Sequence, residues 1–117
     1  MPHLTTAPTR IPVSGGKLID EHVGMASTHT REVSVAHMVA PPGWEEPFQT
    51  PEFDEITIVV KGSVLVDCDG QRLEVHTGQS IITKAGERIR YAAGPLGAEY
   101  VAVCLPAFTP DAAHRED

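Results

Sequence analysis

The sequence predicts an all-β fold formed by one small domain. Apolar and polar residues alternate with a period of two in several short segments, and no segment keeps helical spacing for three turns. The dipeptide Asp69-Gly70, which lies between two alternating segments, is typical of a type I′ hairpin turn. Short strands separated by closely spaced turns of this kind indicate a barrel or a sandwich.

The first predicted strand runs from Val33 to Ala40. Its alternation places His37 on one face together with three valines, while smaller side chains and a methionine occupy the other face. The strand is expected to end at Pro41-Pro42-Gly43, because proline cannot donate a backbone hydrogen bond to a neighbouring strand.

The second predicted strand is the β-branched segment from Glu55 to Val60, in which Glu55 and Thr57 share one face. Gly62 is expected to end it. The same alternation predicts five further strands, at Ser63 to Cys68, Gln71 to His76, Ser80 to Thr83, Arg88 to Ala92 and Glu99 to Leu105. Turns at 84–86 and 94–97 are expected to separate the last three strands.

The composition fits a single domain over residues 1–117, with an N-terminal arm at 1–16 and a C-terminal tail at 106–117 that lack alternation. A net charge of −7 without a basic block argues against nucleic acid as a partner. No segment approaches the roughly 20 apolar residues of a membrane span. The two cysteines are expected to be buried thiols, so we predict a cytoplasmic protein, and a homodimer, as many barrels of this size form.

Two segments carry a resemblance to a known family. Residues 43–62 read GWEEPFQTPEFDEITIVVKG and reproduce the spacing of the first cupin motif, G-x5-H-x-H-x3-E-x6-G, without its histidines. Residues 78–93 follow the second motif, G-x5-P-x-G-x2-H-x3-N, in spacing and in both glycines. The chain therefore resembles the cupins, and among them the small ethanolamine-utilisation type. The resemblance implies a cupin (RmlC-like) double-stranded β-helix, or jelly-roll barrel, with Glu55 and Thr57 directed into the barrel.

The resemblance also locates the positions at which cupins hold a metal. These four positions fall on Gln49, Pro51, Glu55 and Ile89. Only Glu55 is a competent ligand for a divalent ion, so we expect no tightly bound metal cofactor. An alternative is a rebuilt site for a divalent transition metal, formed by His37, Glu45 and Glu55.

Glu55 is the main candidate for a catalytic residue. A carboxylate inside an apolar barrel loses hydration, which raises its pKa and suits it to act as a general acid or base near neutral pH. The alternative interpretation is a structural carboxylate that accepts hydrogen bonds from a tyrosine or a backbone amide. Tyr91 is expected on the same inward face and within reach of Glu55. His37 is interpreted either as a further catalytic group or as a histidine of the core.

These residues lead to three hypotheses about function. The first is an enzyme of the isomerase, lyase or cyclase type, which acts on a small molecule through Glu55, Tyr91 and His37 without a metal. Its ligand would contact four further side chains, those of Gln49, Trp44, Thr57 and Ile89. The second is a non-catalytic ligand-binding or accessory module, and the third is a metal-dependent enzyme that uses the rebuilt site.

Overall fold

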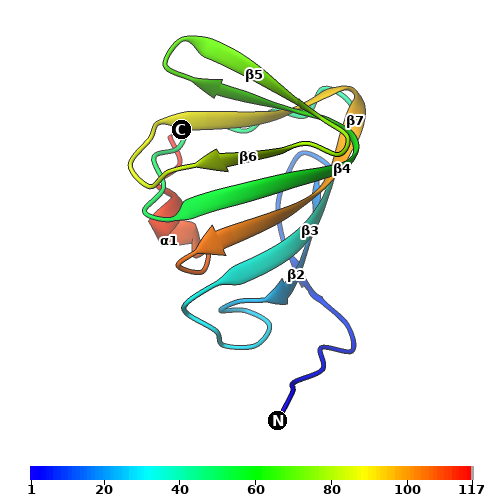
Figure 1. Ribbon diagram of the computed structural model, residues 1–117, viewed down its shortest axis with the longest axis vertical. Helices are drawn as coiled ribbons and strands as arrows, with labels where there is room; N and C mark the ends of the chain where they lie inside the picture. Colours follow the sequence, from blue (N-terminus) through cyan, green and yellow to red (C-terminus); the bar gives the residue numbers. More distant parts are fainter. Residues whose placement is uncertain (117) are drawn as a thin grey trace.

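The computed structural model describes residues 1–116 and consists almost entirely of antiparallel strands (Figure 1). The strands pair in the order β1-β2-β3-β7-β4-β5, and β6 pairs with β4. This confirms the all-β prediction. The elements are β1 (Thr9–Ile11), β2 (Leu18–Val23), β3 (Ser34–Ala40), β4 (Asp54–Cys68), β5 (Gln71–His76), β6 (Ser80–Thr83), β7 (Ile89–Leu105) and the short helix α1 (Pro110–Ala113).

Strands β4 and β7 are longer than the sequence predicted, and they run through both layers of the barrel (Figure 1). The prediction that Gly62 ends a strand is wrong, and so is the predicted turn at 94–97. At Gly62 the backbone bends, but pairing with β7 continues through Ala98 on one side and Ala93 on the other, with a shift in register. A glycine at a barrel corner therefore bends these strands without ending them.

The predicted hairpin around Asp69-Gly70 is confirmed. Strands β4 and β5 pair from Ser63 with His76 to Cys68 with Gln71. Asp69 and Gly70 have φ values of 52° and 73°, and a type I′ turn requires positive φ at both central residues. Cys68 and Cys104 are both free thiols, the first half-buried and the second buried.

Strands β1 and β2 extend the sheet beyond the first strand that the sequence predicted. Strand β1 lies within the segment expected to be an arm, and it pairs with β2 from Thr9 with Glu21 to Ile11 with Ile19. Strand β2 in turn pairs with β3. Its inward positions carry Ile19 and the charged Glu21, both buried, and this mixture hides the alternation that predicts a half-buried strand.

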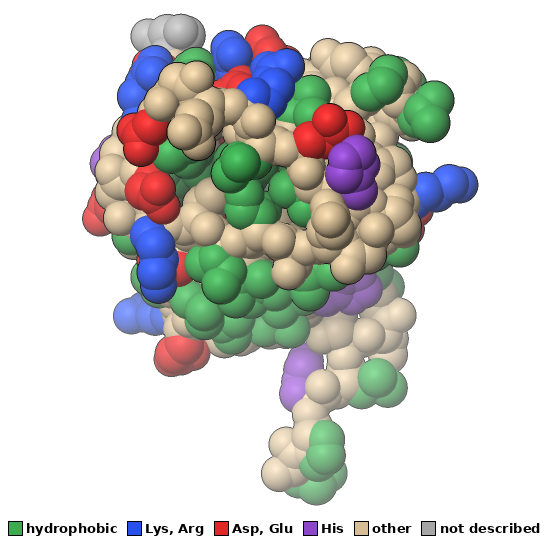
Figure 2. All heavy atoms as spheres, turned by 45° about the horizontal axis from the view of Figure 1, so that its top comes forward, with side chains coloured by type: hydrophobic (Ala, Val, Ile, Leu, Met, Phe, Trp, Pro, Cys, Tyr) green, Lys and Arg blue, Asp and Glu red, His purple; other side chains and the backbone are tan. Residues whose placement is uncertain are grey.

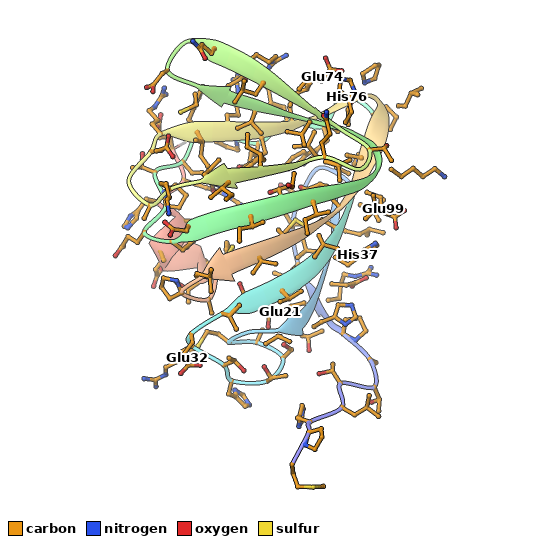
Figure 3. The ribbon with its side chains drawn as sticks, in the orientation of Figure 1. Glu21, Glu32, His37, Glu74, His76 and Glu99 are labelled. Atoms are coloured by element: carbon orange, nitrogen blue, oxygen red, sulfur yellow. The ribbon has the colours of Figure 1, made fainter. Side chains whose placement is uncertain are left out.

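Strand β3 places its small side chains inward. Ser34, Ala36 and Ala40 are buried, whereas His37 and the valines lie on the outer face. The expectation that His37 reaches the barrel interior is therefore wrong. Its Nε2 atom lies 2.9 Å from a carboxylate oxygen of Glu99 on the neighbouring strand β7 (Figure 3).

The C-terminal segment packs against one end of the barrel. The ring of Phe108 meets that of Phe53 edge-on at 5.8 Å, and Ala113 of α1 is buried against the same cluster. Thr109 caps the helix, because its hydroxyl accepts a hydrogen bond from the backbone N–H of Ala112. This packing brings Arg115, just beyond the helix, to the rim of the pocket inside the barrel.

The outer face of the sheet carries exposed apolar side chains, and hydrophobic side chains gather over the lower part of the barrel in Figure 2. Ile58, Val60 and Ile82 are about half exposed there. The homodimer stays a prediction. Within residues 1–116, no helix has the length and apolar character needed to cross a membrane.

Candidate functional site

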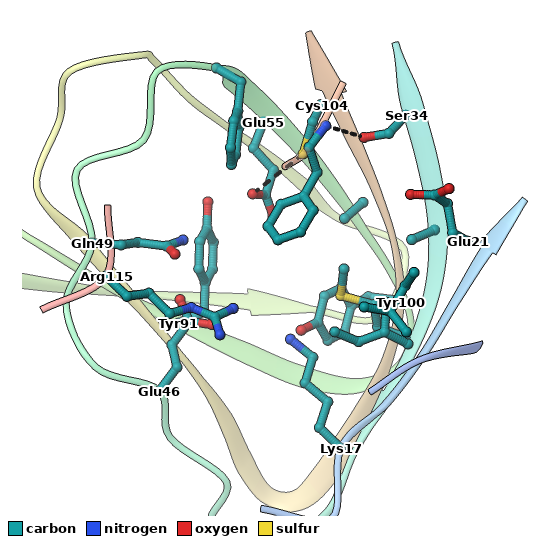
Figure 4. A pocket seen from close by; sticks show the side chains of 17 residues that line it. Lys17, Glu21, Ser34, Glu46, Gln49, Glu55, Tyr91, Tyr100, Cys104 and Arg115 are labelled. Atoms are coloured by element: carbon teal, nitrogen blue, oxygen red, sulfur yellow. Dashed lines mark hydrogen bonds between the residues drawn. The ribbon is translucent and has the colours of Figure 1, made fainter. Parts of the chain in front are cut away.

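A pocket of about 50 Å³ lies inside the barrel, and side chains from the segment before β2 and from the C-terminal segment contribute to its wall (Figure 4). Small inward residues of β3 and β7, such as Ala36 and Ala102, leave the space that larger side chains would fill. Most of the surface that faces the cavity is contributed by apolar atoms. The polar and titratable groups on its wall are Lys17, Glu21, Ser34, Glu46, Gln49, Glu55, Tyr91, Tyr100, Cys104 and Arg115.

Glu55 projects from β4 into this pocket with only 8% of its surface exposed. Its carboxylate has two long contacts, a hydrogen bond of 3.5 Å from Thr57 Oγ1 and one of 3.8 Å from Cys104 Sγ. The pKa of Glu55 is raised to about 7, chiefly by burial and also by the nearby Glu46, while Lys17 acts in the opposite direction. Glu55 is therefore a carboxyl group that exchanges its proton near neutral pH.

Glu46 and Gln49 enter the pocket from the loop that precedes β4. Backbone hydrogen bonds of 2.8 and 2.9 Å join Gln49 to Ile89 and hold this loop against β7. Glu46 is buried, and burial raises the pKa of its carboxyl group. Among the residues that the structure describes, Glu46 Oε2 and Gln49 Oε1 are buried and have no hydrogen-bond partner. Both side chains therefore present a free acceptor to the pocket.

Lys17 lies immediately before β2, and its side chain enters the pocket from the opposite wall (Figure 4). It is only 6% exposed, and its Nζ atom lies 4.1 Å from the ring centre of Trp44 and 5.3 Å from that of Tyr100. Aromatic faces attract an ammonium group. Burial nevertheless lowers the pKa of Lys17 to about 8, although Glu46 and Glu55 favour its charged form.

Two charged side chains complete the rim of the pocket. Arg115 lies near Gln49, with which it forms an isolated backbone bridge, and its side chain points toward Glu46 (Figure 4). Glu21 on β2 is already held, because its Oε2 atom accepts backbone hydrogen bonds from Ala26 and Ser27 at 3.0 and 2.7 Å. Glu21 is thus a fixed part of the wall.

Tyr91 and the four predicted ligand contacts lie in or near the barrel interior. Tyr91 lines the pocket, but its hydroxyl pairs with Thr83 Oγ1 at 2.7 Å, so the predicted hydrogen bond to Glu55 is wrong. Thr57 is fully buried beside Glu55, and Ile89 belongs to the core behind Gln49. Trp44 is half-buried beneath the Lys17 ammonium.

The structure separates the members of the predicted rebuilt metal site. Glu45 lies on the outside of the barrel, where it pairs with Arg72 at 3.8 Å and Arg90 at 3.5 Å. His37 lies on the outer face as well, so neither residue meets Glu55. Across residues 1–116, no three His, Cys, Asp or Glu side chains are placed to hold a metal ion together.

The four positions that correspond to the metal ligands of cupins do not fit a metal either. Ile89 is buried in the core and offers no donor atom, and Pro51 offers only its backbone carbonyl oxygen, which accepts a hydrogen bond from Gly86. Gln49 and Glu55 remain. A transition metal needs three or four converging side-chain donors, so this set is insufficient.

Sequence reasoning missed Lys17, Glu46 and Arg115. The isolated bridge between Glu45 and Ala92 shows that residues 44–49 run alongside β7, which turns Glu46 inward and Glu45 outward. Alternation in the sequence separates the two glutamates onto opposite faces, but it does not indicate which of them faces inward. No comparable signal exists for Lys17 and Arg115, which lie near opposite ends of the chain and meet only through folding.

Comparison with known proteins agrees with this architecture. Residues 36–104 match the family model described as a cupin domain, which covers more than half of the chain. The chain belongs to the cupin family. This cupin is similar in structure to KdgF from Halomonas sp., with a TM-score of 0.73 at 15% identity, covering 88% of this chain and 89% of that one.

Two further solved structures show the same fold. An RmlC-like cupin from Shewanella frigidimarina has a TM-score of 0.73 at 17% identity and covers 86% of this cupin and 85% of its own chain. The EutQ protein of Clostridium difficile has a TM-score of 0.65 at 19% identity, with 80% and 72% covered. At these identities the similarity shows the fold alone.

A curated relative shares more of the sequence. The protein named endoribonuclease YbeY from Myxococcus xanthus strain DK1622 is 46% identical over 107 residues, which are 91% of this cupin. The aligned part is only 36% of that protein. This cupin therefore spans about a third of the relative that it matches.

Proposed function

We propose that this cupin binds a small molecule and performs acid–base chemistry on it, with Glu55 as the group that accepts and returns a proton. The observation that carries the proposal is the position of Glu55, buried in a pocket with a pKa of about 7. At neutral pH both protonation states of such a carboxyl group are populated, as a general acid or base requires. Reactions of the isomerase, lyase or cyclase type need this chemistry.

The opposite wall supports the same proposal. When a base removes a proton from a carbon atom, negative charge develops on the adjacent carbonyl oxygen. Lys17 and Arg115 provide positive charge at the pocket, and Lys17 is held by the rings of Trp44 and Tyr100. Lys17 is buried, and a cation held in this way stabilises a developing oxyanion in a site from which water is largely excluded.

The test uses hydrogen exchange, which does not require the natural substrate. Small carbonyl compounds that raise the melting temperature of the protein are incubated with it in D₂O, and NMR follows exchange of the C–H beside the carbonyl group. We expect Glu55→Gln to slow this exchange by at least about 100-fold, the usual contribution of a general base. Glu45→Gln is the matched control, because Glu45 lies outside the barrel. Equal exchange by the wild type and Glu55→Gln would refute the proposal.

A second candidate function is an accessory module within a longer protein, which the match to 36% of the Myxococcus xanthus protein favours. With a net charge of −7, this cupin is not expected to bind RNA itself. If it is such a module, deletion of the matching segment from the Myxococcus xanthus protein should change its rate of RNA cleavage. An unchanged rate in the deleted protein, with its fold intact by circular dichroism, would reject this candidate.

A further inference from the structure

The pocket contains two hydrogen-bond acceptors whose partners are missing. Glu46 Oε2 and Gln49 Oε1 are buried and have no partner within residues 1–116. Leaving such atoms unsatisfied destabilises the folded protein, so proteins rarely keep them without a reason. Both face the pocket from the same loop (Figure 4). A ligand that donates hydrogen bonds would satisfy them.

Two cationic side chains at the pocket also lack a carboxylate partner in the part of the chain that the structure describes. Among residues 1–116, neither the Lys17 ammonium nor the Arg115 guanidinium forms an ion pair within 4.0 Å, although both influence the pKa of Glu46. Lys17, Arg115, Glu46 and Gln49 all line the same pocket, so a ligand bound there can lie between the cations and the acceptors. A ligand in this position must accept hydrogen bonds on one side and donate them on the other.

The hydroxyl group meets both requirements, since its oxygen accepts hydrogen bonds while its hydrogen donates one. A ligand carboxylate would suit Lys17 and Arg115, but it would oppose Glu46 and donate nothing to Gln49. A ligand ammonium would suit Glu46 and Gln49, but the two cations would repel it. The charges already in the pocket thus oppose each other and favour a neutral ligand that joins them.

We propose that the pocket binds a compact, neutral, polyhydroxylated molecule, whose hydroxyl groups connect Lys17 and Arg115 to Glu46 and Gln49. The cavity of about 50 Å³ corresponds to roughly three to five water positions and is open on one side, so it admits only a small molecule. Apolar side chains such as Ala36 and Ala102 provide contacts for its carbon skeleton. This inference specifies the ligand class for the acid–base site proposed above and rests on that proposal.

The experiment compares four-carbon probes that differ in their polar groups. Erythritol and erythrulose are neutral and polyhydroxylated, succinate is a dianion without hydroxyl groups, and 1,4-diaminobutane is a dication. Trp44 is the only tryptophan and lies against Lys17, so a change in its fluorescence measures ligand binding beside Lys17. We expect erythritol and erythrulose to bind at least about tenfold more tightly than the two charged probes, a difference of about 1.4 kcal/mol.

Gln49→Leu tests the bridging geometry without threatening the fold. The change removes an unsatisfied buried acceptor, so the melting temperature should stay the same or rise. Erythritol affinity should nevertheless fall by roughly tenfold, the loss expected for one hydrogen bond. Gln71→Leu is the control, because Gln71 is exposed on β5 and its replacement should leave the affinity unchanged.

The outcomes separate this inference from the proposed function. Tighter binding of succinate or 1,4-diaminobutane, or no binding of either polyhydroxylated probe, overturns the ligand class. An affinity of Gln49→Leu equal to that of the wild type overturns it as well. Glu55→Gln should still bind erythritol, because Glu55 is not one of the bridging groups. If erythrulose binds but does not exchange its C–H protons, the result supports the ligand class. The same result contradicts only the proposed acid–base chemistry.

Discussion

Replacing Gly62 by alanine is expected to lower the free energy of unfolding by at least about 4 kcal/mol, a large part of the stability of a small domain. Gly62 has a φ of +74°, a region that residues with a Cβ atom rarely occupy. A Cβ atom at this position would lie 2.1 Å from the backbone oxygen of Gly97. Real Cβ atoms do not approach another atom so closely, so the backbone itself must move.

Neither strand has freedom to relieve this contact. Gly62 pairs with Ala98 where β4 and β7 bend together at the barrel corner. Gly97 in turn lies against the backbone of Ala40 at the end of β3, where a Cβ atom on Gly97 would lie 2.8 Å from the Ala40 oxygen. A shift of β7 away from Gly62 would therefore disturb the pairing of three strands that form the pocket wall.

Thermal unfolding followed by circular dichroism measures this effect. Gly62→Ala should melt at least about 15 °C below the wild type. Gly78→Ala is the matched control, because Gly78 has a similar φ of +84° but no atom within 4 Å of a Cβ placed there. Gly78→Ala should lower the free energy of unfolding by only about 1–2 kcal/mol, which is the cost of a left-handed conformation for a residue with a Cβ atom. Similar melting temperatures for the two variants would show that the corner is not closely packed.

The strands that the sequence predicted best are those with local signals. The Asp69-Gly70 hairpin needs only a turn dipeptide and alternation on both sides, and both are visible in the sequence. The continuity of β4 and β7 was not visible, because a glycine that bends a paired strand and one that ends a strand look alike. Only the pairing of Gly62 with Ala98, which depends on the folded sheet, distinguishes the two cases.

The site shows the same division between local and tertiary information. The period of two placed Glu55 and Thr57 on one face, and the resemblance to the cupins correctly indicated that this face is the interior. The same period failed for His37, because alternation defines two faces without indicating which one faces inward. In β3 the inner face carries alanine and serine, since larger side chains would fill the pocket. Lys17 and Arg115 reach the pocket only because the segment before β2 and the segment after β7 fold toward the same cavity.

The free energy of unfolding of the wild type is expected to depend on pH more strongly than that of Glu55→Gln, because only the wild type has the ionisable Glu55. The pKa of Glu55 is about 7 in the folded protein and near 4.5 when the group is exposed, so the folded state holds this proton more tightly. Its contribution to stability is therefore fully present below pH 4.5 and is lost as the pH rises through 7. When the pH rises from 5.5 to 8.5, the free energy of unfolding of the wild type should fall by about 2 kcal/mol more than that of Glu55→Gln.

Urea unfolding of both proteins at the two pH values measures this difference. The comparison removes the effect of the glutamine itself, since its packing and hydrogen bonds are the same at both pH values. The charged groups that face Glu55 are Glu46 and Lys17, and both are retained in the variant. Equal losses in the two proteins would place the pKa of Glu55 near its ordinary value. A carboxyl group with that pKa is almost fully ionised at neutral pH, and it would be a weak base that cannot readily return a proton as an acid.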